Sequence, residues 1–296
     1  LEAARATREG GPRVGEECSS RWSAAHQGNM LGGPGQFHAQ ERAKRNLEVP
    51  FGWFPQPVYF ASIARRHMHA YGTRPEHLGE IAVAFRRHAN RHPGAVMHGR
   101  ELTLDGYLER PMLCDPLRVE DCCLISDGGA AFVMTSAERA RDLAKRPVLA
   151  TGVGEARAHT GTWWAQQPDF TATPQVFSAP PAFAMAGVAP GDVDVLTLYD
   201  PFTIAALMQI EDMGFCAKGE GGAFVAGGNL RVGGGALPYN PHGGMLSHAY
   251  VLGIAHVVET VRQLRGEAHA QVPGARVGVY GGYTGHMAST LVLEAG

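Results

Sequence analysis

The sequence predicts an α/β fold in which helices cover a mixed β-sheet. The main observation is that segments of strand type alternate with segments of helical period through the second half of the chain. Within that half, residues 193–200 form an apolar run that ends in an aspartate, which is typical of a fully buried strand. The 39 glycines and 19 prolines among 296 residues indicate many tight turns, and apolar segments recur throughout, so the composition is that of a folded protein.

Helices dominate the prediction for the first half. Residues 1–10 have the pattern of a helix end, and residues 13–49 are polar, glycine-rich and expected to be irregular. Helical periodicity then recurs in three places, where the first helix ends at a glycine and the second ends before a proline: residues 54–72, 75–92 and 102–110.

The rest of the chain alternates between strands and helices. Residues 120–135 predict a buried strand pair around a glycine turn, and residues 137–145 predict a helix. A second pattern begins after Pro147. It predicts strands over residues 148–157, 193–200, 275–283 and 289–295, helices over 178–187, 201–215 and 250–265, and a glycine-dense loop over 218–244.

Charge and hydropathy exclude several classes of partner. With 26 basic and 28 acidic residues the formal net charge is -2, so no nucleic acid partner is expected. No apolar run approaches the length of about 20 residues that crosses a membrane, and no signal peptide opens the sequence, so no membrane association is expected. These features predict a cytoplasmic protein.

The cysteines and histidines predict no metal site in this chain. None of the 14 histidines shows a spacing such as His-Glu-x-x-His, and no Cys-x-x-Cys pair occurs. The odd number of cysteines, with one adjacent pair, favours reduced structural thiols in the cytoplasm: Cys18, Cys114, Cys122, Cys123 and Cys216.

Residues 240–268 carry the strongest functional pattern. A turn rich in proline and glycine leads to the predicted helix over residues 250–265, and Ser247, His248 and Tyr250 lie at the junction. Backbone N–H groups at a helix start, together with polar side chains, can converge on a ligand there. The junction rests on an apolar helix face formed by Val251, Leu252, Ile254, Val258, Val261 and Leu264.

This segment resembles the active-site segment of thiolases, in which Ser-Lys-Gly-His-Pro-Leu-Gly precedes a helix ending in Gln-Leu-Arg-Gly. Ser247, Gly253 and residues 263–266 match that pattern. The catalytic histidine of the family falls on Tyr250, and the proline after it falls on Val251. The chain therefore resembles a thiolase without the thiolase histidine.

Three other motifs extend the resemblance. Residues 125–131 resemble the Asn-Asp-Gly-Ala-Ala turn of thiolases, where small residues let the two half-domains pack closely. Residues 199–202 occupy the position of Asn-Glu-Ala-Phe, or of His-Asp-Cys-Phe, with Tyr199 in place of the Asn or His that positions the oxyanion-hole water. Residues 279–285 resemble Cys-Ile-Gly-Gly-Gly-x-Gly, with Val279 in place of the acid/base cysteine and Tyr283 in place of the third glycine.

The resemblance implies an α/β fold of the thiolase type, with a layered α/β/α/β/α architecture whose N-terminal half is incomplete in this chain. Residues 1–146 are then the remainder of the N-terminal half with an inserted loop and helical region, and residues 147–296 are the C-terminal half.

The replaced residues are those that carry thiolase chemistry, because a Claisen thiolase uses a histidine and a second cysteine beside its nucleophile. Tyr199 and Tyr250 are the leading catalytic candidates, with Tyr283 as a third. One phenol would stabilise a thioester enolate, and another, partly ionised by a histidine or the helix dipole, would remove the proton of a β-hydroxyl group. That chemistry is a retro-aldol cleavage. The opposing interpretation is that these tyrosines only fill space.

The neighbours of the tyrosines have expected roles of their own. Ser247, His248 and Gly282 are expected to bind substrate. His248 and His242 are candidates to tune a phenol, although a histidine in such a position is more often a surface residue. Asp200 is either a catalytic base or the cap of the helix after Pro201.

Together the motifs look like the sterol-carrier-protein thiolase-like group, also known as lipid-transfer proteins, and within it the steroid side-chain-cleaving aldolases of actinobacteria. This resemblance implies that a 17-hydroxy steroid with a short CoA-thioester side chain is split into a 17-keto steroid and propionyl-CoA. It also implies a homodimer associated with a small partner that contains an OB-fold and a zinc ribbon, so that any zinc belongs to the partner. The chain itself needs no cofactor beyond the coenzyme A of its substrate.

Two alternatives remain open. A β-ketoacyl-CoA thiolase would use a nucleophilic cysteine upstream of Leu1, and a non-catalytic acyl-CoA or lipid-binding protein would show no turnover. Residues 13–52 and 163–177, which include Trp163 and Trp164, are either an apolar wall for the substrate or an interface surface.

Overall fold

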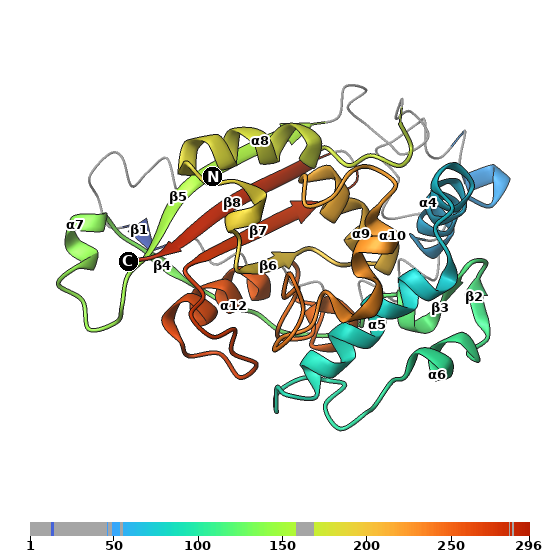
Figure 1. Cartoon of the computed structure of the whole chain (residues 1–296), viewed down its shortest axis with the longest axis horizontal. Coiled ribbons are helices and arrows are strands. Elements are labelled where there is room, and N and C mark those ends of the chain that lie inside the picture. The colour runs from blue at the N-terminus through green and yellow to red at the C-terminus, as the bar shows by residue number, and fades with distance from the viewer. Residues whose placement is uncertain are drawn as a thin grey trace.

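A four-stranded mixed sheet forms the centre of the computed structural model, which describes residues 13–14, 46, 49–53, 56–157, 169–283, 285 and 287–296 (Figure 1). The strands, in spatial order, are β5 (Val148–Arg157), β8 (Met287–Ala295), β7 (Val277–Tyr283) and β6 (Val195–Leu198). β8 is antiparallel to both β5 and β7, whereas β6 and β7 are parallel.

Helices cover both faces of this sheet. α8 (Gln175–Ala186) packs on one face against β5 and β8, and α12 (Ile254–Arg265) packs on the other against β6 and β7 (Figure 1). The α12 face requires small residues in β7, since a Cβ at Gly278 would come within 2.5 Å of Thr260 Cγ2. The α/β prediction is therefore confirmed, and these layers are the C-terminal part of the predicted arrangement.

Helices of the first half pack beside the open end of the sheet near β6. These are α4 (Gln56–Tyr71), α5 (Pro75–Ala89) and the short α6 (Leu104–Leu108), and they lie with α9 (Thr203–Asp212), α10 (Gly221–Val225) and α11 (Gly244–Ser247) (Figure 1). One continuous hydrophobic core joins them to the sheet, with Tyr59, Phe85, Leu198 and Ile204 among its buried members. Residues on both sides of the predicted domain boundary at residue 146 thus share one core, and the division into two halves stays a prediction.

The remaining elements are short. They are two small antiparallel pairs, β1 (Arg13–Val14) with β4 (Val133–Met134) and β2 (Met112–Cys114) with β3 (Leu117–Arg118), the helix α7 (Ala137–Ala140), and the 3-10 turns η2 (Val49–Phe51), η3 (Val119–Asp121), η5 (Pro190–Asp192) and η6 (Ala226–Gly228).

Three predictions of elements are wrong. The strand pair over residues 120–135 is absent, and most of that segment is irregular because its backbone bonds to residues 201 and 245 instead of to itself. The glycine-dense segment 218–244 contains α10 and η6. The last long helix begins at Ile254 and not at Tyr250, because Leu252 has a φ of 57° that an α-helix does not allow.

Some predictions fall where nothing is described. The helix end over residues 1–10, nearly all of residues 13–49, Cys18, Trp163 and Trp164 lie outside the described residues. Among the helices of the described part, none has the length and apolar character needed to cross a membrane.

Candidate active site

Two of the predicted tyrosines meet directly. The hydroxyl oxygens of Tyr199 and Tyr250 are 2.8 Å apart, and their rings meet edge to face with centroids 6.4 Å apart. Both side chains are half-buried. The structure therefore brings the leading pair of candidates into one hydrogen bond.

Tyr199 is positioned by the end of β6. Its backbone N–H donates to Gly281 of β7, which extends the sheet pairing by one residue. Because side chains alternate along a strand, Tyr199 lies on the same face as Thr197, whose hydroxyl is 2.6 Å from that of Thr260 in α12. Tyr199 is thus on the α12 face of the sheet.

Tyr250 lies in the connection between α11 and α12. Its N–H donates to Ser126 Oγ at 3.2 Å, so the irregular segment after η3 holds the backbone of Tyr250 in place. That segment approaches closely because Gly128 has no side chain, and a Cβ there would come within 2.5 Å of Val251 Cγ1. The predicted glycine turn therefore has a packing role, against the residue next to Tyr250.

A third tyrosine lies on this face, and the sequence motifs do not single it out. Tyr280 of β7 points toward α12, and its hydroxyl lies so close to Gly253 that a Cβ there would overlap it. The same hydroxyl would be 2.9 Å from a Cβ at Gly282. Two glycines therefore make room for Tyr280 beside the Tyr199–Tyr250 pair, and this alternation of glycine and tyrosine in β7 was the signal in the sequence.

Burial controls the ionisation of the pair. It raises the pKa of Tyr199 well above its ordinary value, and the neighbouring Tyr250 raises it further. Burial and the nearby Cys123 raise the pKa of Tyr250 to about 12, although the hydrogen bond from Tyr199 acts in the opposite direction. The ionised phenol expected from the sequence is therefore disfavoured, and both hydroxyl groups are neutral near pH 7.

The hydrogen bonds of Asp200 go to partners other than the tyrosine pair. Its carboxylate accepts hydrogen bonds from the N–H groups of Met245 and Leu246 at the start of α11, and its Oδ1 is 2.8 Å from His256 Nε2. Asp200 is fully buried. It is therefore a cap, as one prediction had it, but of α11 and not of the helix after Pro201.

Comparison with known proteins gives a consistent family. A model described as thiolase C-terminal domain-like matches residues 156–295. The steroid side-chain-cleaving aldolase of Thermomonospora curvata is 40% identical over 253 residues, which cover 83% of this chain and 64% of that protein. A solved structure of an Ltp2-ChsH2(DUF35) aldolase matches with a TM-score of 0.81 at 37% identity and covers 86% of this chain and 67% of that one. The chain belongs to the thiolase superfamily.

One further relative and one further solved structure show how far the similarity extends. The 17-hydroxy-3-oxo-4-pregnene-20-carboxyl-CoA lyase of Mycobacterium tuberculosis is 38% identical, over 84% of this chain and 65% of that protein. This thiolase-superfamily chain thus spans just under two thirds of the length of the two curated relatives. A monomeric SCP2-thiolase like protein from Mycobacterium smegmatis, with a TM-score of 0.63 at 19% identity, shares the fold.

Tyr283 is not brought to the pair. It lies in β7 on the opposite face from Tyr280, is 2% exposed and belongs to the main hydrophobic core. Burial and the nearby Asp212 raise its pKa well above the ordinary value. Gly282, predicted to bind substrate, is on the Tyr280 face, where a Cβ would also come within 2.6 Å of Ser289 Oγ.

Ser247 and His248 lie at the predicted junction but face other partners. The Ser247 hydroxyl is buried and accepts a hydrogen bond from Arg86 Nε at 3.1 Å. His248 belongs to a row of histidine rings whose centroids are 4.4 to 5.2 Å apart, in the order His256, His242, His248, His92 and His269. Neither side chain is among the contacts of the tyrosine pair.

Burial keeps the inner histidines of this row neutral. It lowers the pKa of His248 to about 4 and that of His242 well below its ordinary value, and repulsion from the other histidines adds to both shifts. Within the described part of the chain, no three His, Cys, Asp or Glu side chains form a group that could hold a metal ion.

The described cysteines are free thiols. Cys123 lies beside the tyrosine pair, where burial and the charge of Asp200 raise its pKa to about 12. Burial also raises the pKa of Cys122, and raises that of Cys216 to about 12. High thiol pKa values disfavour the thiolate, so the structural role predicted for these cysteines is consistent with their surroundings.

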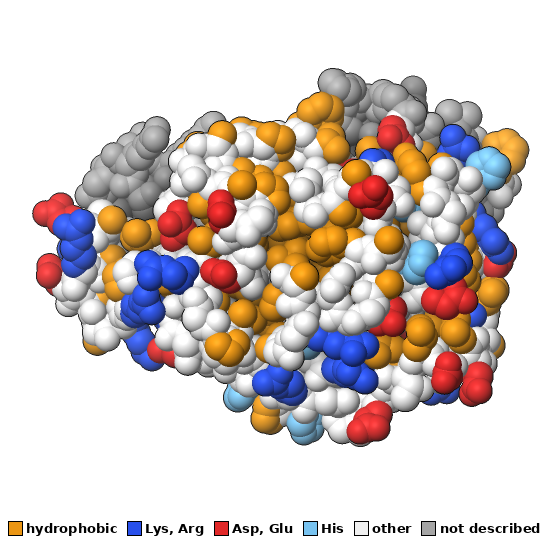
Figure 2. Space-filling model, in the orientation of Figure 1, with side chains coloured by type: hydrophobic (Ala, Val, Ile, Leu, Met, Phe, Trp, Pro, Cys, Tyr) orange, Lys and Arg blue, Asp and Glu red, His pale blue; other side chains and the backbone are white. Residues whose placement is uncertain are grey.

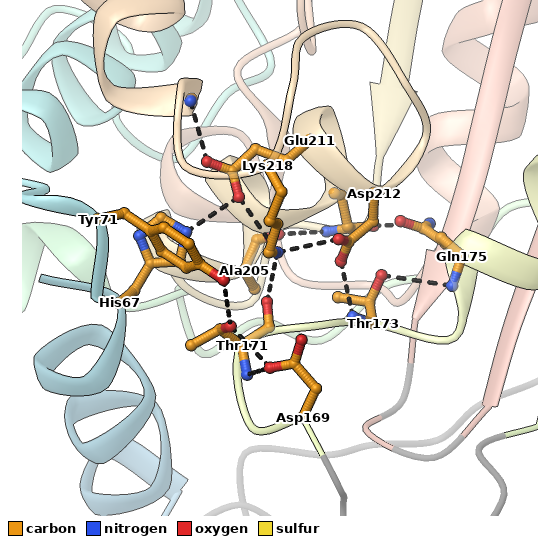
Figure 3. Close-up of polar contacts among 12 residues, drawn as sticks. His67, Tyr71, Asp169, Thr171, Thr173, Gln175, Ala205, Glu211, Asp212 and Lys218 are labelled. Carbon is orange, nitrogen blue, oxygen red and sulfur yellow. Dashed lines mark hydrogen bonds and ion pairs between the residues drawn. The ribbon is translucent and has the colours of Figure 1, made fainter. Parts of the chain in front are cut away.

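A buried charge network supports the opposite face (Figure 3). Glu211 lies 2.9 Å from His67 Nε2 and 3.1 Å from Lys218 Nζ, and the same ammonium lies 2.9 Å from Asp212. Asp212 also accepts from the N–H of Thr173 at 2.6 Å. The Lys218 ammonium lies between two carboxylates and also donates to the carbonyl of Thr171, so the network links α4, α9 and residues 169–175.

One glutamine connects this region to the tyrosine pair. Gln209 of α9 donates through Nε2 to the carbonyl of Tyr199 at 2.7 Å and to that of Ala205 at 2.9 Å. Its Oε1 accepts from Gln175 Nε2 at 3.0 Å. The backbone of Tyr199 is therefore held from behind the sheet while its side chain faces Tyr250.

Proposed function

We propose that this chain catalyses the retro-aldol cleavage of a β-hydroxyacyl-CoA thioester. The observation that carries the proposal is the hydrogen bond between Tyr199 and Tyr250 where thiolases place an Asn or His and the catalytic histidine. The proposed substrate is a 17-hydroxy steroid with a short CoA-thioester side chain, giving a 17-keto steroid and propionyl-CoA. The names of the relatives from Thermomonospora curvata and Mycobacterium tuberculosis support this choice.

The pair suits a reaction in which one proton moves from the β-hydroxyl group to the α-carbon and neither phenol gains or loses a proton overall. In the proposed step one phenol accepts the proton of the β-hydroxyl group, a proton crosses the 2.8 Å bond, and the other phenol gives its proton to the α-carbon. The C–O bond becomes a carbonyl, and the electron pair of the broken C–C bond forms the thioester enolate that takes up the proton. Both phenols end neutral, as their raised pKa values require.

Tyr280 is proposed as the third phenol of the site. Its hydroxyl lies on the same face, between Gly253 and Gly282, and it acts electrostatically on Tyr199. A phenol here offers a donor to the enolate oxygen as negative charge develops. We leave Tyr283 out of the proposed step because its side chain lies in the core on the other face.

The assembly is also proposed from the relatives. The solved aldolase is described as Ltp2-ChsH2(DUF35), which pairs Ltp2 with a second component and so supports a partner subunit for this chain. We propose a homodimer that associates with a small OB-fold and zinc-ribbon protein, which would hold any zinc, in the cytoplasm. Co-expression with such a partner, followed by size-exclusion chromatography coupled to light scattering, tests both the dimer and the partner.

The deciding experiment is incubation with a panel of β-hydroxyacyl-CoA and β-ketoacyl-CoA esters, with products identified by mass. A retro-aldolase releases a ketone and a shorter acyl-CoA without added CoA. A thiolase instead consumes free CoA and a β-ketoacyl-CoA, and a binding protein shows no turnover. Either of those two outcomes would refute the proposal.

Thiol alkylation sharpens the distinction. Treatment with iodoacetamide should leave a retro-aldolase active and inactivate a thiolase that uses a cysteine. Because Cys123 is beside the pair, alkylation there would block the site for steric reasons. The variant Cys123→Ser removes this ambiguity and should keep most of the activity both before and after alkylation.

A further inference from the structure

A cavity of about 380 Å³ lies between α5 and the glycine-rich loop over residues 227–234. Its lining includes three arginines, Arg87, Arg91 and Arg231. Figure 2 shows Lys and Arg side chains gathered over α5 in this view. The reaction proposed above uses none of these residues, although a concave site of this size and charge is suited to a small ligand.

The positive charge of the cavity is largely uncompensated. Arg231 is 3.5 Å from Glu80, and within the described residues this is the only ion pair that any of the three arginines makes. Arg87 and Arg91 are exposed, and Arg91 donates only to the carbonyl of Val232, at 3.5 Å. Arg231 Nε is buried and finds no acceptor in the described part. Of the three guanidinium groups, those of Arg87 and Arg91 therefore have no carboxylate partner within the described residues, and that of Arg231 has one at 3.5 Å.

Hydrogen bonds of His88 connect α5 to the loop that lines the cavity. His88 Nε2 accepts a hydrogen bond from the N–H of Val232 at 3.1 Å, and its Nδ1 donates to the carbonyl of Asn240 at 3.1 Å. Burial lowers the pKa of His88 to about 4, so this neutral ring fixes the loop and adds no charge. Within the loop, Gly228 makes room for the Arg231 guanidinium, because a Cβ at residue 228 would come within 2.7 Å of it.

We propose that this cavity is a binding site for a phosphate-bearing ligand of nucleotide size. Guanidinium groups bind phosphate oxygens through paired N–H donors, and a concave positive site concentrates anions. A volume of about 380 Å³ holds a phosphate together with part of the sugar or base to which it is attached. The phosphate could come from the nucleotide end of coenzyme A, an assignment that rests on the proposed function, or from a separate phosphorylated ligand.

The test is isothermal titration calorimetry with adenosine 3′,5′-bisphosphate and, separately, inorganic phosphate. The wild-type chain should bind the bisphosphate, and Arg87→Gln combined with Arg231→Gln should weaken binding at least tenfold. The matched control is Arg139→Gln with Arg141→Gln, which removes the same charge near α7 and should leave the affinity unchanged. Absence of bisphosphate binding to the wild-type chain, or equal loss in both double variants, would overturn the proposal.

Kinetics then separate the two sources of phosphate. If the site holds the nucleotide end of coenzyme A, the arginine variant should raise KM for the acyl-CoA at least fivefold with little change in kcat. The wild-type chain should show the same rise with the dephospho-CoA ester. An unchanged KM together with lost bisphosphate binding assigns the cavity to a separate ligand. If the chain cleaves no ester but still binds the bisphosphate, the proposed reaction fails and the site stands.

Discussion

Tyr199 and Tyr283 follow or end neighbouring parallel strands, yet their side chains lie on opposite faces of the sheet. On the α12 face, Tyr199 meets Tyr250 through a 2.8 Å hydrogen bond, and Tyr280 stands beside them. On the α8 face, Tyr283 is embedded in the hydrophobic core near Asp212. The same side chain is therefore a candidate for chemistry on one face and a packing element on the other.

The face of the sheet on which a tyrosine lies, more than its position in a motif, therefore decides whether it is a candidate for catalysis. The two faces also differ in charge. On the α8 and α9 side, Lys218 lies between the carboxylates of Glu211 and Asp212, whereas both phenols of the tyrosine pair are neutral near pH 7. Experiments that alter one face at a time can break this comparison or sharpen it.

The largest effect is expected for Tyr250→Phe. Removal of this hydroxyl breaks the proposed proton path, so kcat for the β-hydroxyacyl-CoA should fall by about 100- to 10,000-fold while ester binding persists. Tyr283→Phe is the matched control on the other face and should change kcat by less than about threefold, because a remote packing change alters no transition-state contact. Steady-state kinetics and ester binding by calorimetry check both variants. Equal losses in the two would contradict the comparison.

The histidine row predicts a loss of stability in acid. Since the folded pKa of His248 is lowered to about 4 from 6.5, the unfolded state binds this proton first as the pH falls. Its contribution is complete above pH 6.5 and is lost as the pH falls toward 4. His248→Gln should therefore reduce the fall in unfolding free energy between pH 7 and pH 4.5 by about 2 kcal/mol.

Urea denaturation at the two pH values measures this change. The control His69→Gln replaces an exposed histidine of α4 and should leave the pH dependence of the wild-type chain intact. A pH dependence that is the same in both variants would show that His248 is protonated equally in the folded and unfolded states.

A smaller effect on catalysis is expected for Tyr280→Phe. If this hydroxyl stabilises the enolate, kcat should fall about tenfold, because the loss of one hydrogen-bond donor costs roughly 1 to 2 kcal/mol. The double variant Tyr280→Phe with Tyr250→Phe should lose little beyond Tyr250→Phe alone, since residues that act as a unit are not additive. An unchanged kcat in the single variant would remove Tyr280 from the site.

The smallest effect is expected for Ser247→Ala. It leaves Arg86 Nε without its acceptor, so the free energy of unfolding should fall by about 1 kcal/mol. Turnover and KM should stay within about twofold of the wild-type values if Ser247 supports α5 and does not contact substrate. A large rise in KM with unchanged stability would instead restore the substrate-binding role predicted from the sequence.

Much of the fold follows from the sequence because its patterns are local. The apolar run before Tyr199 and the amphipathic period up to Arg265 led directly to β6 and α12. The start of α12 could not be predicted, because a positive φ is uncommon for a leucine and nothing in the sequence signals it at Leu252. The segment around Ser126 read as strands because it is apolar, but its partners lie at residues 201 and 245, far along the chain.

The sequence motifs predict one part of the candidate site, the tyrosine pair, because each motif is local in the chain. The resemblance to the thiolase motifs predicts Tyr199 and Tyr250 as the leading pair, because each stands in place of a residue to which that resemblance assigns chemistry. It gave Tyr283 the same standing, because a motif records order along the chain and does not record which face a side chain takes. The arginine cavity joins α5 to a loop more than 130 residues away, so no local pattern marks it.

The alternation at the end of β6 also limits how this gene can change. The side chains of Thr197 and Tyr199 lie on the α12 face of the sheet, whereas Leu198 faces the core and Asp200 caps α11. Insertion or deletion of one codon within β6 would exchange the two faces, so that the phenol would point into the core and the Asp200 carboxylate would lose its contacts with α11 and with His256 of α12. Length variation among natural homologues should therefore be absent from β6 and should accumulate in exposed connections, such as residues 141–146 between α7 and β5.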